Sequence, residues 1–180
     1  EMKLAASELG ILIDVNSRDN TIAPPYFGCQ FDPNQGSFGA VYIGNLKLAG
    51  TLNSMRDKII LNSSKAFFMK LFGSVTWKLG QLWDLGYQHG DIKGANIVLA
   101  DNGEPFLIDF NLSQKTSDQL LCGGTPGYMS SGKRNCANRN PVMYDDMYSL
   151  AITMGTILAD GGESEVNRDS DNCASKWIPG

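Results

Sequence analysis

The sequence predicts an α+β fold, and this prediction rests on one hairpin pattern and two helix patterns. Residues 97–99 and 106–108 are short apolar runs on either side of Asn102-Gly103, a dipeptide typical of tight β-hairpins. Apolar residues at steps of three and four predict one helix before this hairpin and another after it. With 180 residues, 42% of them hydrophobic, the chain is long enough for one packed domain.

The two predicted helices have recognisable ends. Ser63 or Ser64 can cap the start of the first helix, and Gly86 suits its exit. The second helix begins near Asp145 or Asp146. The apolar face of the first helix comprises Phe68, Phe72, Val75, Leu79 and Leu82, and that of the second comprises Met147, Leu150, Ala151, Met154, Ile157 and Leu158.

The mouth of the predicted hairpin gathers polar residues. If Asn102 and Gly103 are its two loop residues, Asn96 lies directly opposite Asp109, with Cβ atoms roughly 5 Å apart. Mg²⁺ prefers oxygen ligands such as the amide and carboxylate of this pair. Asp and Asn also occur at strand ends as turn formers. That alternative does not explain why further polar residues precede the same mouth.

Two motifs at this mouth resemble those of the protein-kinase family, of the bacterial-like serine/threonine type. Residues 89–96 (HGDIKGAN) are similar to the catalytic loop H-R-D-x-K-x-x-N, and residues 109–111 (DFN) to the metal loop D-F-G. The resemblance implies that Asp91 orients the substrate hydroxyl and accepts its proton, and that Lys93 neutralises charge on the transferred phosphoryl group. The Mg²⁺ ligands that it implies are Asn96 and Asp109.

Both motifs depart from the family pattern at one position. Gly90 replaces the arginine of the catalytic loop, which implies a kinase that does not need phosphorylation of its activation segment. Asn111 replaces the glycine of D-F-G, and Asn is the non-glycine residue that best tolerates a positive φ.

Residues 35–42 (QGSFGAVY) resemble the glycine-rich loop that covers the phosphates of ATP. By this resemblance Gly36 and Gly39 let backbone N–H groups approach the phosphates, and Val41 lies against the adenine. Asn34 stands where the family has its first glycine. A plain turn between two strands is the alternative.

Lys58 is the best candidate for the small-lobe strand lysine that grips the α- and β-phosphates, and Lys47 is a poorer one. A solvated strand lysine is the alternative for both. Too few residues separate Lys58 from the catalytic loop for the family's αC helix, its next two strands and the hinge that reads adenine. The acids nearby, Asp57 and Asp84, are not placed to form the family's Lys–Glu ion pair.

Residues 123–129 (GGTPGYM) resemble the substrate-docking end of an activation segment. The resemblance implies that Thr125 pairs with Asp91 and Lys93, a combination that goes with serine/threonine rather than tyrosine substrates. The sequence Ser-Ser-Gly at 130–132 replaces the family's A-P-E, so the glutamate that anchors the segment is missing. The rigidity of the substrate platform is therefore in doubt.

Two further residues have implied structural roles beneath the catalytic loop. Asp146 matches the aspartate of D-V-Y-S-L that holds the backbone of this loop, and a simple helix N-cap is the alternative. His89 is the single histidine of the chain. It is expected to be a structural residue packed beneath the loop, with a general base as the alternative.

Composition excludes several classes of function. No run of about 18 apolar residues is present, so no transmembrane span is expected. The net charge of −4 and the lack of a basic face argue against nucleic-acid binding. The cysteines at positions 29, 122, 136 and 173 lack C-x-x-C spacing and are interpreted as ordinary cytosolic thiols. The start lacks a signal-peptide pattern, so a cytoplasmic location is expected.

The expected architecture is an abridged, protein-kinase-like α+β domain over residues 26–160. It combines a reduced N-terminal β-sheet lobe (26–62) with a truncated, mainly helical C-terminal lobe (63–160). Residues 1–25 are expected to form an N-terminal extension. Residues 161–180 are polar and are expected to form a mobile tail.

The expected function is ATP-dependent phosphorylation of serine or threonine on a protein substrate, with ATP and Mg²⁺ as cofactors. A non-catalytic pseudokinase that binds a partner or a nucleotide is the first alternative. A small-molecule kinase of the aminoglycoside or choline type is the second, because such enzymes share H-G-D and I-D-F motifs. The activation-segment motif around Thr125 and the motif at 146–149 argue against this second alternative, since those enzymes lack such a segment.

Overall fold

The computed structural model of this chain describes residues 2–25, 28–32, 37–41, 47–136 and 138–159. The expected tail at 161–180 lies outside these residues. Helices and strands are both present, so the described chain is a mixed α+β structure. The helices are α1 (Met2–Arg18), α2 (Leu52–Asn62), α3 (Lys65–Asp84), the 3₁₀ turn η1 (Gly94–Asn96), α4 (Ser131–Arg134) and α5 (Met143–Leu158). The strands are β1 (Gly28–Asp32), β2 (Ser37–Val41), β3 (Leu48–Thr51), β4 (Tyr87–Gln88), β5 (Ile97–Ala100), β6 (Pro105–Leu107) and β7 (Gln114–Lys115).

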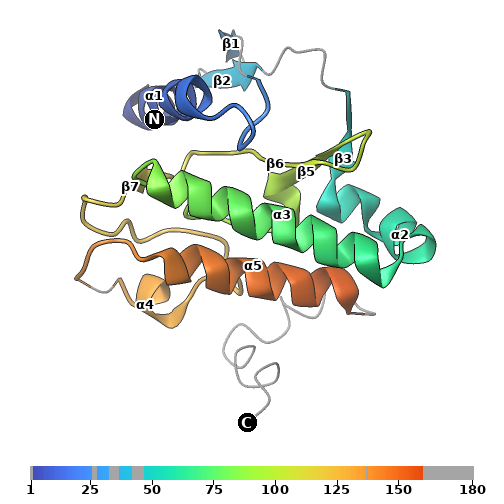
Figure 1. The fold of residues 1–180 in the computed structure, drawn as a ribbon. Coiled ribbons are helices and arrows are strands. Elements are labelled where there is room, and N and C mark those ends of the chain that lie inside the picture. Colours follow the sequence, from blue (N-terminus) through green and yellow to red (C-terminus); the bar gives the residue numbers. More distant parts are fainter. Residues whose placement is uncertain (1, 26–27, 33–36, 42–46, 137, 160–180) are drawn as a thin grey trace.

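The strands form three small antiparallel sheets. β1 pairs with β2, β4 pairs with β7, and β5 lies between β3 and β6 in the third sheet. In Figure 1, α1 with β1 and β2 forms the upper part of the molecule, and α3 and α5 form the lower part. Strand β3, from the expected small lobe, therefore shares a sheet with two strands of the expected large lobe.

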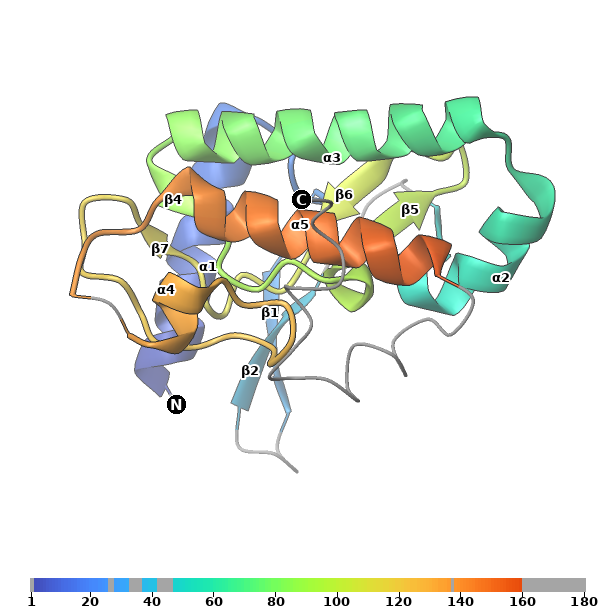
Figure 2. The same cartoon turned by 90° about the horizontal axis from the view of Figure 1, so that it is seen from below.

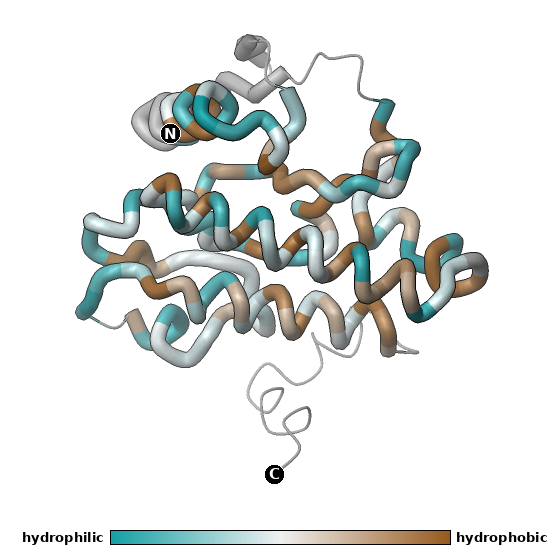
Figure 3. The backbone as a smooth tube through the Cα atoms, viewed as in Figure 1, coloured by the Kyte–Doolittle hydropathy of each residue, from teal (hydrophilic) through white to brown (hydrophobic). Residues whose placement is uncertain are grey.

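Both predicted helices are present, and they lie side by side in Figure 1 and in Figure 2. The Oγ of Ser64 caps α3 by accepting the N–H of Phe67 (3.2 Å), and Gly86 follows the helix with φ +89°. α5 begins at Met143, slightly before the predicted start. Figure 3 shows hydrophobic and hydrophilic positions alternating along both helices, as expected for helices with one buried face.

The predicted hairpin is also present, but its predicted register is wrong by one residue. The N–H of Ile108 donates to the carbonyl of Asn96 (3.0 Å), so Asn96 faces Ile108 and not Asp109. The cause is the loop, which has three residues, 101–103, rather than two. Gly103 takes φ +81° at its end, the usual way in which a three-residue hairpin loop closes.

The first 25 residues contribute to the main hydrophobic core. The buried side chains of Leu12, Val15 and Ile22 join the same apolar cluster as the buried faces of α3 and α5. The expected N-terminal extension is thus packed against the rest of the chain. Among the described helices, none combines the length and the apolar character that crossing a membrane requires.

Candidate functional site

Three of the predicted site residues form one hydrogen-bonded cluster, in which Asp91 and Lys93 come from the loop between β4 and η1 and Thr125 comes from the segment between β7 and α4. The ammonium of Lys93 donates to Asp91 Oδ2 and to Thr125 Oγ1, both at 2.8 Å. The N–H and the hydroxyl of Thr125 donate to Asp91 Oδ1 at 2.9 and 2.8 Å. The predicted pairing of Thr125 with Asp91 and Lys93 is therefore confirmed.

These bonds set the protonation state of Asp91, whose side chain is buried. Burial by itself would raise the pKa of this carboxyl group. The hydrogen bonds from Lys93 and Thr125 outweigh that effect and hold the pKa below its usual range. Asp91 is therefore a carboxylate at neutral pH, and it can accept a hydrogen bond or a proton from a hydroxyl group.

Asn96 lies beside the same carboxylate. Its Nδ2 donates to the backbone carbonyl of Asp91 (2.9 Å) and to Asp91 Oδ2 (3.1 Å). The close packing of α2 holds this part of the loop, because a Cβ atom on Gly94 would meet Asn53 Oδ1 at 2.0 Å. With Nδ2 directed at Asp91, the amide oxygen of Asn96 is directed away from it.

Asp109 lies two residues after the end of β6, with φ +63°. The sequence led us to expect tolerance of positive φ at Asn111, but the left-handed residue of this motif is Asp109. The amide of Asn111 donates to Asp109 Oδ1 (2.8 Å). Because the backbone leaves the strand conformation here, the side-chain alternation of β6 does not extend to Asp109.

His89 is fully buried and has the structural role expected of it. Its Nδ1 accepts the N–H of Asp91 (3.3 Å), and its Nε2 lies 3.0 Å from the carbonyl of Ile108. Its ring packs against Phe110, with 4.9 Å between ring centroids. Burial lowers the pKa of His89, although the charges of the neighbouring aspartates act in the opposite direction.

Asp146 holds the backbone of the catalytic loop, as the kinase resemblance implies. Its carboxylate accepts the N–H groups of His89 (2.8 Å) and Gly90 (2.9 Å), and it does not cap α5. Gly90 has φ +86°, and a Cβ atom there would meet the carbonyl oxygen of Leu112 at 2.4 Å. The backbone at this position therefore requires the glycine that stands where kinases have arginine.

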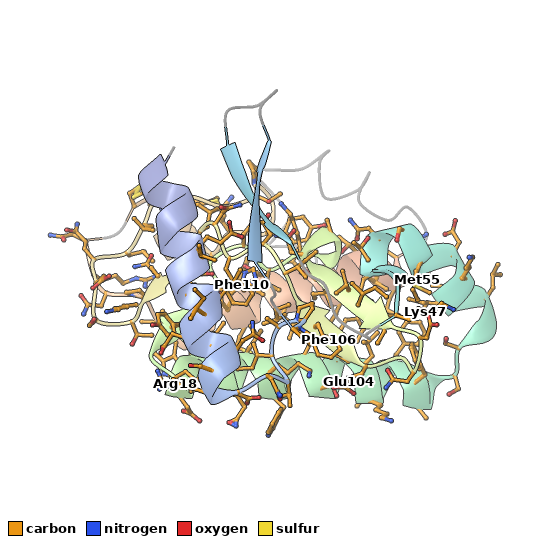
Figure 4. The ribbon with its side chains drawn as sticks, turned by 90° about the horizontal axis from the view of Figure 1, so that it is seen from above. Arg18, Lys47, Met55, Glu104, Phe106 and Phe110 are labelled. Carbon is orange, nitrogen blue, oxygen red and sulfur yellow. A yellow bond between two sulfur atoms is a disulfide. The ribbon has the colours of Figure 1, made fainter. Side chains whose placement is uncertain are left out.

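Glu8 on α1 is a neighbour of the metal motif that no sequence pattern indicated. Its carboxylate accepts the backbone N–H of Phe110, which lies beside α1 in Figure 4. Burial raises the pKa of Glu8, and the charge of Asp109 raises it further. Glu8 thus comes from the N-terminal helix and not from the stretch between the glycine-rich loop and the catalytic loop, where Asp57 and Asp84 were considered as partners of the lysine.

A polar network anchors the activation segment in place of the missing glutamate. Ser130 caps α4 and donates its hydroxyl to Asp145 Oδ1 (2.5 Å), and Arg139 donates to both oxygens of the same carboxylate (2.8 and 3.0 Å). The ammonium of Lys133 donates to the carbonyl of Gly90. These hydrogen bonds join the segment to α5 and to the loop at 89–96 through residues whose roles their spacing does not reveal.

A disulfide joins Cys122 and Cys136, whose Cα atoms are 5.1 Å apart. The prediction that all four cysteines are free thiols is therefore wrong for this pair. The lack of C-x-x-C spacing did not exclude this disulfide. The chain turns back on itself between the two residues and brings their Cα atoms within the range that a disulfide can bridge.

The predicted nucleotide-binding residues are described only in part. Gly36 lies outside the described residues. Gly39 and Val41 are on β2, opposite Gln30 and Gly28 of β1, and this hairpin fits both a glycine-rich loop and a plain turn. Lys58 is exposed on α2, so its predicted location on a strand is wrong. Thr51, which caps α2 by accepting the N–H of Ser54 (3.2 Å), starts a helix where a strand was expected.

Comparison with known proteins adds one similarity. No family model matches the chain. Over 73 residues it is 42% identical to the serine/threonine-protein kinase dst2 of Dictyostelium discoideum, a match that covers 37% of this chain and 6% of that kinase. The chain thus contains a segment that is similar to a small part of a serine/threonine-protein kinase.

Proposed function

We propose that this chain is an ATP-dependent serine/threonine protein kinase domain of abridged form. The observation that carries the proposal is the cluster of Asp91, Lys93 and Thr125, in which one carboxylate meets an ammonium and a hydroxyl group. The similarity to a serine/threonine-protein kinase supports the same reading. A small-molecule kinase is disfavoured, because the cluster includes Thr125 from the activation segment.

The reaction would be a phosphoryl transfer. The oxygen of a substrate hydroxyl attacks the γ-phosphorus of ATP, the bond to the β-phosphate oxygen breaks, and ADP leaves. The hydroxyl proton passes to the Asp91 carboxylate. Lys93 lies within reach of the same point and opposes the negative charge of the transferred group. Positioning and electrostatics of this kind account for most of the catalysis of phosphoryl transfer.

The residues present fit a divalent cation. The protein ligands would be Asp109 and Asn96, whose amide oxygen is directed away from Asp91, and among the described residues no three His, Cys, Asp or Glu side chains gather at one metal-sized site. One or two such oxygen ligands, completed by phosphate oxygens, are typical for Mg²⁺. The proximity of Glu8 to Asp109 adds negative charge that a cation would relieve. Bound there, Mg²⁺ would neutralise charge on the phosphates.

A transfer assay with radiolabelled ATP and a generic serine/threonine substrate tests the proposal. We expect slow but measurable phosphorylation by the wild-type protein and none by Asp91→Asn, because the amide cannot accept the proton. Asp57→Asn, which changes an exposed aspartate on α2, is the matched control and should retain activity. Equal background counts from wild type and Asp91→Asn would refute the kinase proposal.

A non-catalytic, nucleotide-binding module is the second candidate. The location of Lys58 on the exposed surface of α2 favours it, since this lysine is not on the strand where it would grip the phosphates. Calorimetric titration with ATP and Mg²⁺ separates the two candidates. Binding without phosphate transfer would support the module. Binding that Asp109→Ala leaves unchanged would show that the metal ligands are misassigned.

A further inference from the structure

We propose that Lys133 is a positioning residue for Asp91, which ties the activation segment to the catalytic loop without any phosphorylation of that segment. The inference rests on the proposed kinase function and concerns the regulation of the same site. Lys133 lies on α4 and is only 3% exposed. Its ammonium donates to the backbone carbonyl of Gly90.

This carbonyl belongs to the peptide unit that leads into the catalytic aspartate. The oxygen of that peptide unit is on Gly90 and its N–H is on Asp91. Lys133 holds the oxygen, and Nδ1 of His89 accepts the N–H (3.3 Å). Both polar groups of the Gly90–Asp91 peptide bond are thus hydrogen-bonded to side chains. Because the peptide bond is planar, these two bonds restrict its rotation, which would otherwise reorient the Asp91 carboxylate.

The activation segment contacts the loop at two points. Thr125 bonds the carboxylate of Asp91, and Lys133 bonds the peptide unit that precedes it. Between these points, Ser130 accepts the N–H of Lys133 (3.2 Å) and bonds Asp145 of α5. The segment therefore bridges the catalytic loop and α5 through hydrogen bonds that all come from unmodified side chains.

The neighbouring carboxylates partly oppose the effect of burial on the Lys133 ammonium. Burial holds the pKa of Lys133 below its ordinary value, the charge of Arg139 lowers it further, and the carboxylates of Asp146, Asp145 and Asp91 offset part of this shift. Burying an unpaired charge costs free energy, and the negative charges of these carboxylates offset part of that cost.

The absence of a side chain at Gly90 leaves room for this ammonium. A Cβ atom on Gly90 would lie 3.0 Å from Lys133 Nζ, so a longer side chain would compete for the same space. Kinases with arginine at this position carry the cation on the catalytic loop. Here the cation comes from the activation segment itself, so a phosphate on the segment is not needed to bring the two together.

Hydrogen exchange of backbone amides tests the tether independently of activity. In Lys133→Met we expect the amides of Asp91 and Thr125 to exchange about tenfold faster, while amides in α3 are unchanged. Lys70→Met, which changes an exposed lysine on α3, is the matched control. Lys133→Arg keeps a charged donor and should preserve the slow exchange. If Lys133→Met fails to fold, Lys133→Ala, which also removes the donor, replaces it. Unchanged exchange at both amides in the folded variant would overturn the proposal.

Kinetics and phosphatase treatment test the regulatory part. In Lys133→Met, kcat should fall about tenfold while the KM for ATP stays the same, because a misplaced Asp91 affects transfer rather than nucleotide binding. Phosphatase-treated wild type should keep its rate, and a loss of rate would overturn independence from phosphorylation. A wild type that is inactive but keeps protected Asp91 and Thr125 amides would refute the kinase function and still support the tether.

Discussion

At the scale of single residues, the catalytic loop is held mainly through its backbone. Asp146 accepts two backbone N–H groups, Ser113 donates its hydroxyl to the carbonyl of His89 (2.9 Å), and Lys133 donates to the carbonyl of Gly90. Hydrogen bonds to charged groups are worth more than those between neutral groups, about 1.5–3 kcal/mol each. The loop can therefore keep its shape although Gly90 provides no side-chain contact.

Burial of His89 predicts a pH dependence of stability. The folded pKa of this residue lies below its ordinary value of 6.5, so below that pH the unfolded chain binds more protons than the folded protein. The stabilising contribution of the neutral, buried His89 should be fully present above pH 6.5. Below that pH the free energy of unfolding should fall as the pH is lowered, by at most about 1.4 kcal/mol per pH unit. Urea denaturation between pH 5.5 and 7.5 measures this slope.

The control for this prediction is His89→Asn. It removes the single histidine of the chain, so its free energy of unfolding should be lower but should depend less on pH. Other groups with shifted pKa values, such as Glu8, contribute equally to both proteins and cancel in the comparison. The prediction is wrong if the two proteins show the same slope.

At the scale of elements, the part of the chain between residues 122 and 136 connects the catalytic loop with α5. It contains Thr125, which meets the catalytic loop, and α4, which meets α5 through Ser130. A disulfide closes it at both ends. This segment thus has a covalent link in addition to its polar contacts.

Removal of this disulfide should destabilise the protein. The two cysteines are 14 residues apart, and closing a loop of that length is worth up to about 3 kcal/mol through the lost entropy of the unfolded chain. Chemical denaturation of wild type and of the double variant Cys122→Ser with Cys136→Ser measures the difference. A reducing agent should lower the stability of wild type and leave the double variant unaffected. Alkylation of all four cysteines in unreduced, denatured wild type would contradict the disulfide.

At the scale of the whole molecule, α1 connects the hydrophobic core with the surroundings of the candidate site. It contributes Leu12 and Val15 to the core and Glu8 to the neighbourhood of Asp109. Its Asp14 accepts the hydroxyl of Tyr87 on β4 (2.9 Å), next to the catalytic loop. The N-terminal helix is therefore part of the core, and it also contacts the motif at 109–111 and the strand that precedes the loop at 89–96.

Two adjacent substitutions test whether α1 is part of the core. Leu12 is fully buried and Ile13 is 52% exposed. Leu12→Ala should lower the free energy of unfolding by about 2–5 kcal/mol, because it removes buried methyl groups and leaves a cavity. Ile13→Ala should change it by no more than about 0.5 kcal/mol. Urea denaturation followed by tryptophan fluorescence compares them, and small, equal effects would mean that α1 is a dispensable extension.

Local patterns were sufficient for α3, α5, the hairpin and the cluster around Asp91, but not for α1 and α2. Helix periodicity and capping depend on residues three or four positions apart, as at Ser64 and Phe67. The catalytic motif places Asp91, Lys93 and Asn96 within one loop, so their proximity follows from chain connectivity. The hairpin register failed because the number of loop residues depends on the backbone conformation at Gly103, which the Asn-Gly pattern leaves open.

The sequence by itself thus determined which polar residues meet in the loop at 89–96 and the elements on each side of it. The tertiary structure decided which distant residues lie against them or against each other: Glu8 beside Asp109, Lys133 on the carbonyl of Gly90, and Cys122 joined to Cys136. The physical reason is that each of these contacts joins residues far apart in the sequence. Helix and strand periodicity indicates only which residues a few positions apart share a face, so it does not predict such contacts. Their contacts exist only after burial of the α1, α3 and α5 faces has brought the chain together.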